Sequence, residues 1–194
     1  PRLDGGPPRR QMAVAYGLIV ADEIEIRPLG ATEHGAVGDA TERAYREFRT
    51  PDSPGWAAYL ARIADVGSRA ERAVVLVAVD EGVIAGSVTL ELGSRIGPGP
   101  SEPLARDEAH VRMLGVAPEH RGRGIARRLM LASIEIARSH GKRVLTLETD
   151  PVMTAAQRLY VELGFEPAAP RVRPDGLPLL SYALHIASDA KTKR

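Results

Sequence analysis

The sequence VRMLGVAPEHRGRGIA, from Val111 to Ala126, decides how this chain folds. Its first part is an apolar run that predicts a strand, and its last part predicts a glycine-rich loop leading into a helix. Gly122 and Gly124 leave the backbone uncovered, so an anion can approach the amide groups. The unpaired N–H groups and the dipole at the start of the helix favour that anion, and Arg121 and Arg123 add charge suited to phosphate oxygens. The pattern predicts a pyrophosphate-binding corner between a strand and a helix.

The loop differs from two other phosphate-binding loops. No Gly-Lys-Ser or Gly-Lys-Thr follows it, as in a Walker loop, and Arg127 stands where the motif G-x-G-x-x-G requires its third glycine. The chain instead reads R-x-x-G-x-A, with Arg121, Gly124 and Ala126 at the fixed positions. This pattern resembles the acetyl-CoA loop of the GNAT superfamily of acyltransferases, Q/R-x-x-G-x-G/A. A basic surface turn that only caps a helix is the alternative interpretation.

A second motif lies on the next predicted helix. Ala156, Leu159 and Tyr160 are followed by Gly164 and Phe165, which gives A-x-x-L-Y-x-x-x-G-F. This is similar to the other landmark of the GNAT superfamily, on the helix after the fifth strand. The two motifs occur in the family's order and cover the C-terminal half of the chain.

The resemblance implies a fold and a cosubstrate. The fold is an α/β (α+β) domain with a mixed, mostly antiparallel sheet of about seven strands, whose parallel strands four and five splay apart, and about four flanking helices. Acetyl-CoA would lie between the splayed strands, its pantetheine arm along the backbone of Leu114, Gly115 and Val116. Its pyrophosphate would bind consecutive amides, those of Arg121, Gly122, Arg123, Gly124, Ile125 and Ala126. The reaction implied is direct acyl transfer from the thioester to a primary amine of an unidentified acceptor.

Direct transfer needs a base for the amine, a donor for the thioester oxygen and a proton for the departing thiolate. Tyr160 stands at the family's usual position for the last role, and the N–H of Val116 is the candidate donor. Two residues compete as the base: Glu148 on the fifth strand, and His110, whose imidazole titrates near neutrality. Each also has a purely structural interpretation, as a core tyrosine, a strand-bonding carboxylate or a strand-end histidine. An ordered water alone is the third alternative for the base, and Glu108 and Glu91 are weaker options.

Met153 departs from the family pattern. Many relatives carry asparagine three residues before the helix alanine, where it contacts the cofactor, whereas a thioether cannot donate a hydrogen bond. Met153 therefore predicts a more apolar acyl end of the cofactor site. Together with the open choice of base, it leaves a second function open, a catalytically silent acyl-CoA sensor or regulatory module.

Composition bounds the remaining function classes. The chain has 194 residues, of which 44% are hydrophobic and 26% charged, and its net charge is +1. These values are typical of one soluble globular domain and argue against nucleic acid or a membrane as partner. Cysteine is absent, which excludes disulfides and thiolate metal sites, and we predict no metal. No apolar run has the length of a membrane span, so we expect a cytoplasmic protein. The resemblance also implies a homodimer paired through the last strand.

Hydrophobic periodicity and turn residues predict the order of the elements. We expect residues 1–22 to be disordered or extended, residues 23–188 to form a single domain, and residues 189–194 to be a flexible tail. The predicted strands cover residues 24–29, 73–79, 83–92, 109–116, 144–149, a stretch from Phe165, and 179–186. The predicted helices cover residues 32–50 with Thr32 as cap, 56–66, 124–141, and 154–164 with a capping box of Thr154 and Gln157. Residues 80–82 predict a tight hairpin, and residues 93–106 and 168–178 predict surface loops.

Overall fold

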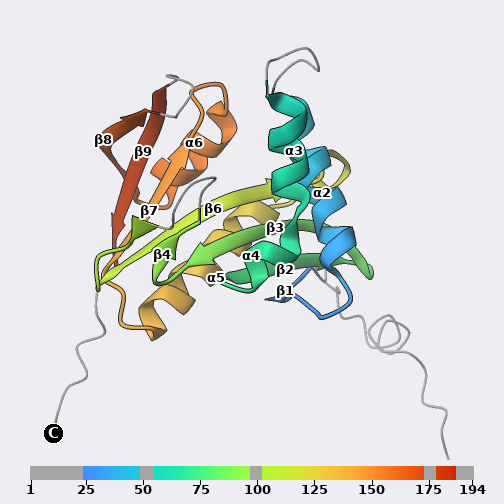
Figure 1. Ribbon diagram of the computed structural model, residues 1–194, viewed down its shortest axis with the longest axis horizontal. Coiled ribbons are helices and arrows are strands. Elements are labelled where there is room, and N and C mark those ends of the chain that lie inside the picture. Colours follow the sequence, from blue (N-terminus) through green and yellow to red (C-terminus); the bar gives the residue numbers. More distant parts are fainter. Residues whose placement is uncertain (1–23, 49–54, 97–101, 173–177, 187–194) are drawn as a thin grey trace, which may run out of the picture.

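The structure, a computed structural model, describes residues 24–48, 55–96, 102–172 and 178–186 (Figure 1). The predicted disordered N-terminus and flexible tail lie outside the described residues. So do residues 97–101 and 173–177 of the two predicted surface loops.

Seven strands form the central sheet in the order β1-β2-β3-β6-β7-β9-β8 (Figure 1). Their bounds are Glu25–Pro28 (β1), Val74–Asp80 (β2), Val83–Glu91 (β3), Glu108–Val116 (β6), Val144–Thr149 (β7), Glu166–Val172 (β8) and Pro178–His185 (β9). β6 and β7 are parallel, whereas the other neighbouring strands are antiparallel. The predicted mixed, mostly antiparallel sheet with one parallel pair is confirmed. A separate pair, β4 (Ser94–Arg95) and β5 (Glu102–Pro103), lies inside the segment predicted as a surface loop.

Five α-helices flank the sheet in the described part of the chain, where about four were expected. Their bounds are His34–Arg46 (α2), Trp56–Ala64 (α3), Val66–Ala70 (α4), Ile125–Ser139 (α5) and Thr154–Glu162 (α6). The unexpected helix is α4. It forms because Asp65 ends α3 and caps a new turn, its carboxylate accepting the N–H of Ser68 at 3.1 Å.

The helices divide between the two faces of the sheet, with α2, α3 and α4 in front of it in Figure 1 and α5 behind. On the α5 face, Leu129 and Tyr160 of α5 and α6 belong to a buried cluster with Leu147 of β7. On the opposite α2 face, Val37 of α2 packs in a second cluster with Val77 of β2. Successive strand residues alternate between these faces, so each buried strand supplies side chains to both.

A β-bulge interrupts this alternation in β6. Ser87 of β3 pairs with Gly115 and Thr89 pairs with Arg112, so β6 has one residue more than β3 between the two pairs. Met113 in the bulge has a φ of 54°, a left-handed value that is uncommon for a residue other than glycine. After the bulge, residues that would face one side of the sheet face the other.

The same strand parts from its parallel neighbour partway along its length. β6 and β7 pair from Glu108 with Val144 to Val111 with Leu147, but β6 continues to Val116 and β7 to Thr149. Beyond Val111 the edge of β6 that faces β7 therefore has no strand partner within the described ranges. β6 and β7 are the fourth and fifth strands of the predicted sheet, and this loss of pairing is the structural basis of their predicted splay.

Several local predictions need correction. α2 has Glu33 as its N-cap residue rather than Thr32, because the Glu33 carboxylate is held by Arg27 at 2.6 Å and by the N–H of Gly30 at 2.7 Å. α6 begins at Thr154 with Met153 as N-cap, so the predicted capping box does not form. Residues 168–172, predicted as loop, continue strand β8, because Ala168, Arg171 and Val172 pair with β9 on either side of a register shift.

The predicted hairpin between β2 and β3 is confirmed. Glu81 and Gly82 have φ values of 49° and 83°, the combination that a type I′ turn requires. None of the helices in the described part of the chain is long and apolar enough to span a membrane.

Candidate functional site

The glycine-rich loop joins the open end of β6 to α5. Gly122 and Gly124 have φ values of 76° and 71°, and Gly124 is the N-cap residue of α5. Among the described residues, no protein acceptor is found for the amides of Gly122, Gly124, Ile125 and Ala126. A Cβ added at either glycine would have no neighbour within 4 Å, so the space beside the loop is open. This arrangement can accept an anion at the start of the helix, as the sequence predicts.

Arg121 has a different place from the one predicted. Its amide donates to the carbonyl of Pro118 at 3.3 Å in the short 3-10 helix Pro118–His120. Its guanidinium donates to Val116 O at 3.1 Å, to Ala44 O at 3.1 Å and to Glu47 Oε1 at 2.5 Å. Both the amide and the side chain therefore already have protein acceptors, and Arg121 joins the end of α2 to the end of β6.

Arg123 binds Asp80 at the end of β2. Arg123 Nη1 donates to Asp80 Oδ2, and Arg123 Nη2 donates to Asp80 Oδ1 at 3.1 Å. His120 Nδ1 lies 2.8 Å from Asp80 Oδ2. The Arg123 hydrogen bond, followed by that of His120 and opposed by burial, lowers the pKa of Asp80. The carboxylate thus fixes the loop to the β2–β3 hairpin from both sides of Gly122.

The last residues of β6 have main-chain groups on the edge that no longer pairs with β7. Ala117 N–H donates to Ala85 O at 2.9 Å, and Val116 is the next residue inward, opposite Gly86. Because hydrogen bonding alternates along an antiparallel pair, the N–H and C=O of Val116 point away from β3. The carbonyls of Val116 and Leu114 accept from Arg121 and Tyr45, each at 3.1 Å, and each retains a second lone pair.

Tyr160 lies on α6 on the α5 face. Its ring centroid is 5.9 Å from those of Phe165 and Tyr182, and only 5% of the residue is exposed. Burial, followed by the influence of Tyr182, raises its pKa. The hydroxyl has no hydrogen-bond partner among the residues that the structure describes. Tyr160 is thus a protonated phenol with an unused donor.

His110 and Glu148 lie on the α2 face and are brought together. His110 Nε2 is 3.7 Å from Glu148 Oε2, and His110 Nδ1 is 2.9 Å from Thr146 Oγ1. Burial, followed by the charges of nearby arginines, holds the pKa of His110 well below its usual range, so the imidazole is neutral. Arg95 of β4 donates to Glu148 at 2.6 Å and to Glu108 at 3.0 Å. Glu148 is therefore an ion-paired carboxylate beside a neutral imidazole.

The sheet separates Tyr160 from these two residues. Leu147 and Tyr182 pair across β7 and β9 on the α5 face, whereas Glu148 and its neighbour Ser181 face the other way. A molecule that meets groups from both faces must therefore pass between β6 and β7 where they part.

Met153 lies just before α6 and is partly buried. Its side chain packs against a cluster from α2, α3 and β6 that contains Tyr45, Trp56, Ile63 and Met113. Met153 thus lies beside an apolar wall on the α2 face, and its contact with the acyl end of a cofactor stays a prediction.

Sequence reasoning missed a buried polar layer on the α2 face and rated one of its members, Glu91, only as a weak option. The layer comprises Thr89 and Glu91 of β3, Arg112 of β6 and Arg69 of α4, and all but Arg112 are buried. The signal in the sequence was that polar residues occupy every second position, at Ser87, Thr89 and Glu91, in a strand whose other residues are mostly apolar. Arg69 left no such signal, because α4 was not predicted.

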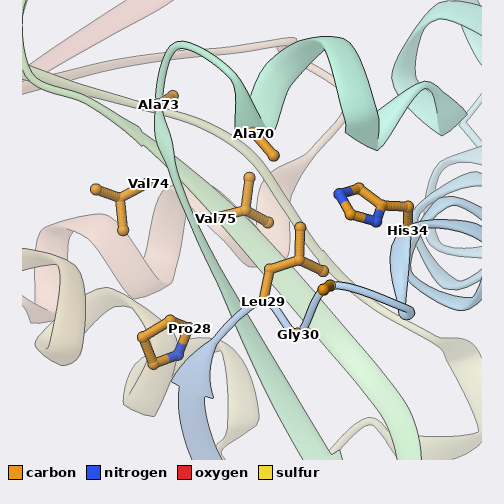
Figure 2. Close-up of a pocket in the computed structure, with 9 residues that line it drawn as sticks. Pro28, Leu29, Gly30, His34, Ala70, Ala73, Val74 and Val75 are labelled. Atoms are coloured by element: carbon orange, nitrogen blue, oxygen red, sulfur yellow. The ribbon is translucent and has the colours of Figure 1, made fainter.

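A hollow of about 360 Å³ lies elsewhere on the molecule (Figure 2). It is lined mainly by apolar side chains, among them Leu29, Ala70 and Val75, and His34 stands at its side. It lies at the start of β2, whereas the glycine-rich loop contacts Asp80 at the end of that strand. It is separate from the candidate site.

Comparison with known proteins agrees with this geometry. A 69-residue segment is 33% identical to N-acetyltransferase 8F1 of Rattus norvegicus, covering 36% of this chain and 31% of that protein. A 55-residue segment is 47% identical to mycothiol acetyltransferase of Thermobispora bispora, covering 28% of this chain and 19% of that protein. These matches span about a third or less of the relatives' length.

Solved structures show the same fold. The structure of yncA, a putative acetyltransferase from Salmonella typhimurium with its cofactor acetyl-CoA, aligns with a TM-score of 0.62 and 23% identity, covering 88% of this chain and 98% of that one. The ribosomal-protein-S18-alanine N-acetyltransferase from Escherichia coli aligns with a TM-score of 0.61 and 23% identity over 88% and 99% of the two chains. The model of the acetyltransferase (GNAT) family matches residues 39–165, well over half of the sequence. The chain belongs to the GNAT acetyltransferase family.

Proposed function

We propose that this protein transfers an acetyl group from acetyl-CoA to a primary amine by direct attack of the amine on the thioester in a ternary complex. The observation that carries the proposal is the row of open amides at Gly122, Gly124, Ile125 and Ala126, next to the point where β6 and β7 part. Family membership and the acetyltransferases among its relatives support the same reaction.

The chain offers suitable partners for each part of the cosubstrate. The open amides and the dipole of α5 suit its pyrophosphate. The unpaired edge of β6 from Leu114 to Val116 suits the amide groups of pantetheine, which would pair with it like an added strand. Arg121 and Arg123 contribute by holding the loop and the strand in place rather than by binding phosphate through their side chains.

The residues around the gap supply the proton transfers. Attack forms a carbon–nitrogen bond and breaks the carbon–sulfur bond, so the amine loses a proton and the thiolate gains one. The neutral imidazole of His110, with Glu148 beside it, takes the proton of the amine, directly or through water. The N–H of Val116 donates to the thioester oxygen as negative charge builds there. The buried phenol of Tyr160 gives its proton to the thiolate from the opposite face.

Tyr160→Phe tests this assignment, with Tyr182→Phe, a neighbouring buried tyrosine, as the matched control. Release of the CoA thiol is measured with acetyl-CoA and a panel of primary amines, and cofactor binding is measured by calorimetry. We expect Tyr160→Phe to lower kcat about 100-fold, with CoA affinity unchanged because the ring is retained, whereas Tyr182→Phe keeps its rate.

Two results would contradict the proposal. An unchanged rate for Tyr160→Phe would remove the phenol from the mechanism. A wild-type protein that binds CoA yet releases no thiol with any amine would instead be an acyl-CoA-binding module without turnover.

A further inference from the structure

A layer of buried polar side chains lies between the sheet and the helices of the α2 face. Thr89 and Glu91 of β3 are fully buried, and they pair across the strands with Arg112 and His110 of β6. Buried strand positions are ordinarily apolar, and a buried charge is costly unless it is paired and hydrogen-bonded. The layer therefore needs partners that explain it.

Arg69 of α4 is the least satisfied member of this layer. Only 5% of the residue is exposed, and one guanidinium nitrogen donates to the carbonyl of Ile63. Its Nε and Nη2 have no hydrogen-bond partner, and no carboxylate pairs with it within the described ranges. Burial, followed by the nearby charge of Arg112, lowers the pKa of Arg69. Arg69 is thus a buried cation beside a second cation, with unused donors.

The other members are also only partly satisfied. Glu91 Oε1 accepts the N–H of Ile96 at 2.9 Å and Arg112 Nη1 at 3.3 Å, while Glu91 Oε2 has no partner. Arg112 Nε and Thr89 Oγ1 also have none. The layer thus holds two guanidinium groups and one carboxylate, which pairs with Arg112 and not with Arg69. It has an excess of positive charge and of hydrogen-bond donors.

This layer borders the place where the acetyl group would be transferred. Tyr45 donates from its hydroxyl to Leu114 O in β6 at 3.1 Å, close to the bulge. Burial raises the pKa of Tyr45, nearby Tyr59 and Tyr160 raise it further, and Arg112 and Arg69 lower it. Arg112 follows Val111, the last residue of β6 that pairs with β7, and it precedes the bulge at Met113. One of the two arginines therefore lies where the unpaired edge of β6 begins.

We propose that Arg69 and Arg112 bind a carboxylate of the acceptor, so that the acceptor is a small amine that also carries an acidic group, such as an α-amino acid. This rests on the proposed function, because it assigns the amine of the same molecule to the His110–Glu148 pair. A carboxylate accepts the unused guanidinium donors as charge-assisted hydrogen bonds, and it balances the second positive charge. The apolar wall of Trp56, Ile63 and Met113 would then pack against the rest of the acceptor.

Matched pairs of amines test the proposal. L-leucine and L-leucinamide, and other α-amino acids with their carboxamides, differ in the acidic group alone. We expect the wild-type protein to acetylate the acids with a kcat/KM about 100-fold higher than the amides, as the loss of a buried charged partner implies. Arg112→Met should remove that preference, Arg69→Lys should retain part of it, and Arg46→Met, a surface control on α2, should keep it whole.

Each outcome decides between the alternatives. Equal use of acids and amides by the wild-type protein overturns the proposal, as does a preference that survives in folded Arg112→Met. If no amine is acetylated although CoA binds, the proposed function fails, and the same pairs are titrated into the protein–CoA complex by calorimetry. Binding of L-leucine but not of L-leucinamide then supports the carboxylate site, and binding of neither or of both overturns it.

Discussion

Arg121 and Arg123 stand two positions apart in the glycine-rich loop, and each is held by its own set of acceptors. Arg121 joins α2 to the end of β6, and Arg123 is fixed by Asp80. A basic residue beside a phosphate site is easily interpreted as a phosphate ligand, but here both guanidinium groups already have protein partners. In the binding mode that we propose, their contribution is to keep the backbone amides in place before the ligand arrives.

The first prediction concerns Asp80, which holds Arg123 and His120. Asp80→Asn removes the charge that fixes the loop, while the side chain keeps its size. We expect calorimetry to show an affinity for CoA about tenfold lower, because the loop must then be ordered on binding. Asp39→Asn, on the exposed side of α2, should bind CoA like the wild type. An unchanged affinity for Asp80→Asn would show that the loop holds its shape without this ion pair.

At the scale of the element, α5 and the loop before it form the unit that we propose binds the anion. Gly124→Ala forces alanine into a backbone conformation with φ near 71°, which costs about 1–2 kcal/mol in the free energy of unfolding. The added methyl group meets no protein atom within 4 Å, so the effect on stability comes from the backbone alone. The same methyl group would stand where the anion approaches, and we expect CoA affinity to fall at least about tenfold.

Gly93→Ala is the control for this substitution. Its added Cβ also meets nothing within 4 Å, and its φ lies outside the left-handed region. Urea unfolding and calorimetry of both variants should show a loss of stability and of CoA binding in Gly124→Ala alone. If the two variants behave alike, neither the φ nor the position of Gly124 contributes to binding.

The elements themselves were largely predictable, whereas their ends were not. A continuous apolar run rich in valine and the turn at Glu81 and Gly82 were enough to predict the β2–β3 hairpin, because those signals are local. The expected caps Thr32 and Thr154 failed because the sequence pattern does not fix the residue at which a helix begins. Glu33 is held by Arg27, and the α6 helix starts one residue after Met153.

At the scale of the whole molecule, the site required contacts that no single stretch contains. The two motifs predicted the glycine loop and placed Tyr160 on the correct helix. The opposite placement of Tyr160 and His110 depends on the order of the strands. The bulge at Met113 and the approach of Arg69 to Arg112 depend on packing between segments far apart in the chain. Neither feature could therefore be predicted from the sequence.

The free energy of unfolding should depend on pH, because burial lowers the pKa of His110. Its pKa lies well below the usual value of about 6.5, so the folded protein keeps it neutral while the unfolded chain binds a proton. The unfolded state then binds more protons, and stability falls as pH drops below that usual value, by up to about 1.4 kcal/mol per pH unit, until the folded-state pKa is reached.

His110→Gln removes this proton linkage. Urea unfolding at pH 7 and pH 5 should show that the variant loses less stability on acidification than the wild type does. His185→Gln, at an exposed position in β9, should lose as much as the wild type. Equal losses for His110→Gln and the wild type would mean that the imidazole takes up its proton without unfolding.

The placement of Tyr160 and the His110–Glu148 pair on opposite faces of the sheet has a consequence for inhibitor design. If the two substrates bind as we propose, a bisubstrate compound, in which an acceptor analogue is joined covalently to CoA, has to pass between β6 and β7 beyond Val111 and Leu147, where the strands no longer pair. Its linker must therefore be slender at that point, and branching there would bar it from one face however well each end fits its own half.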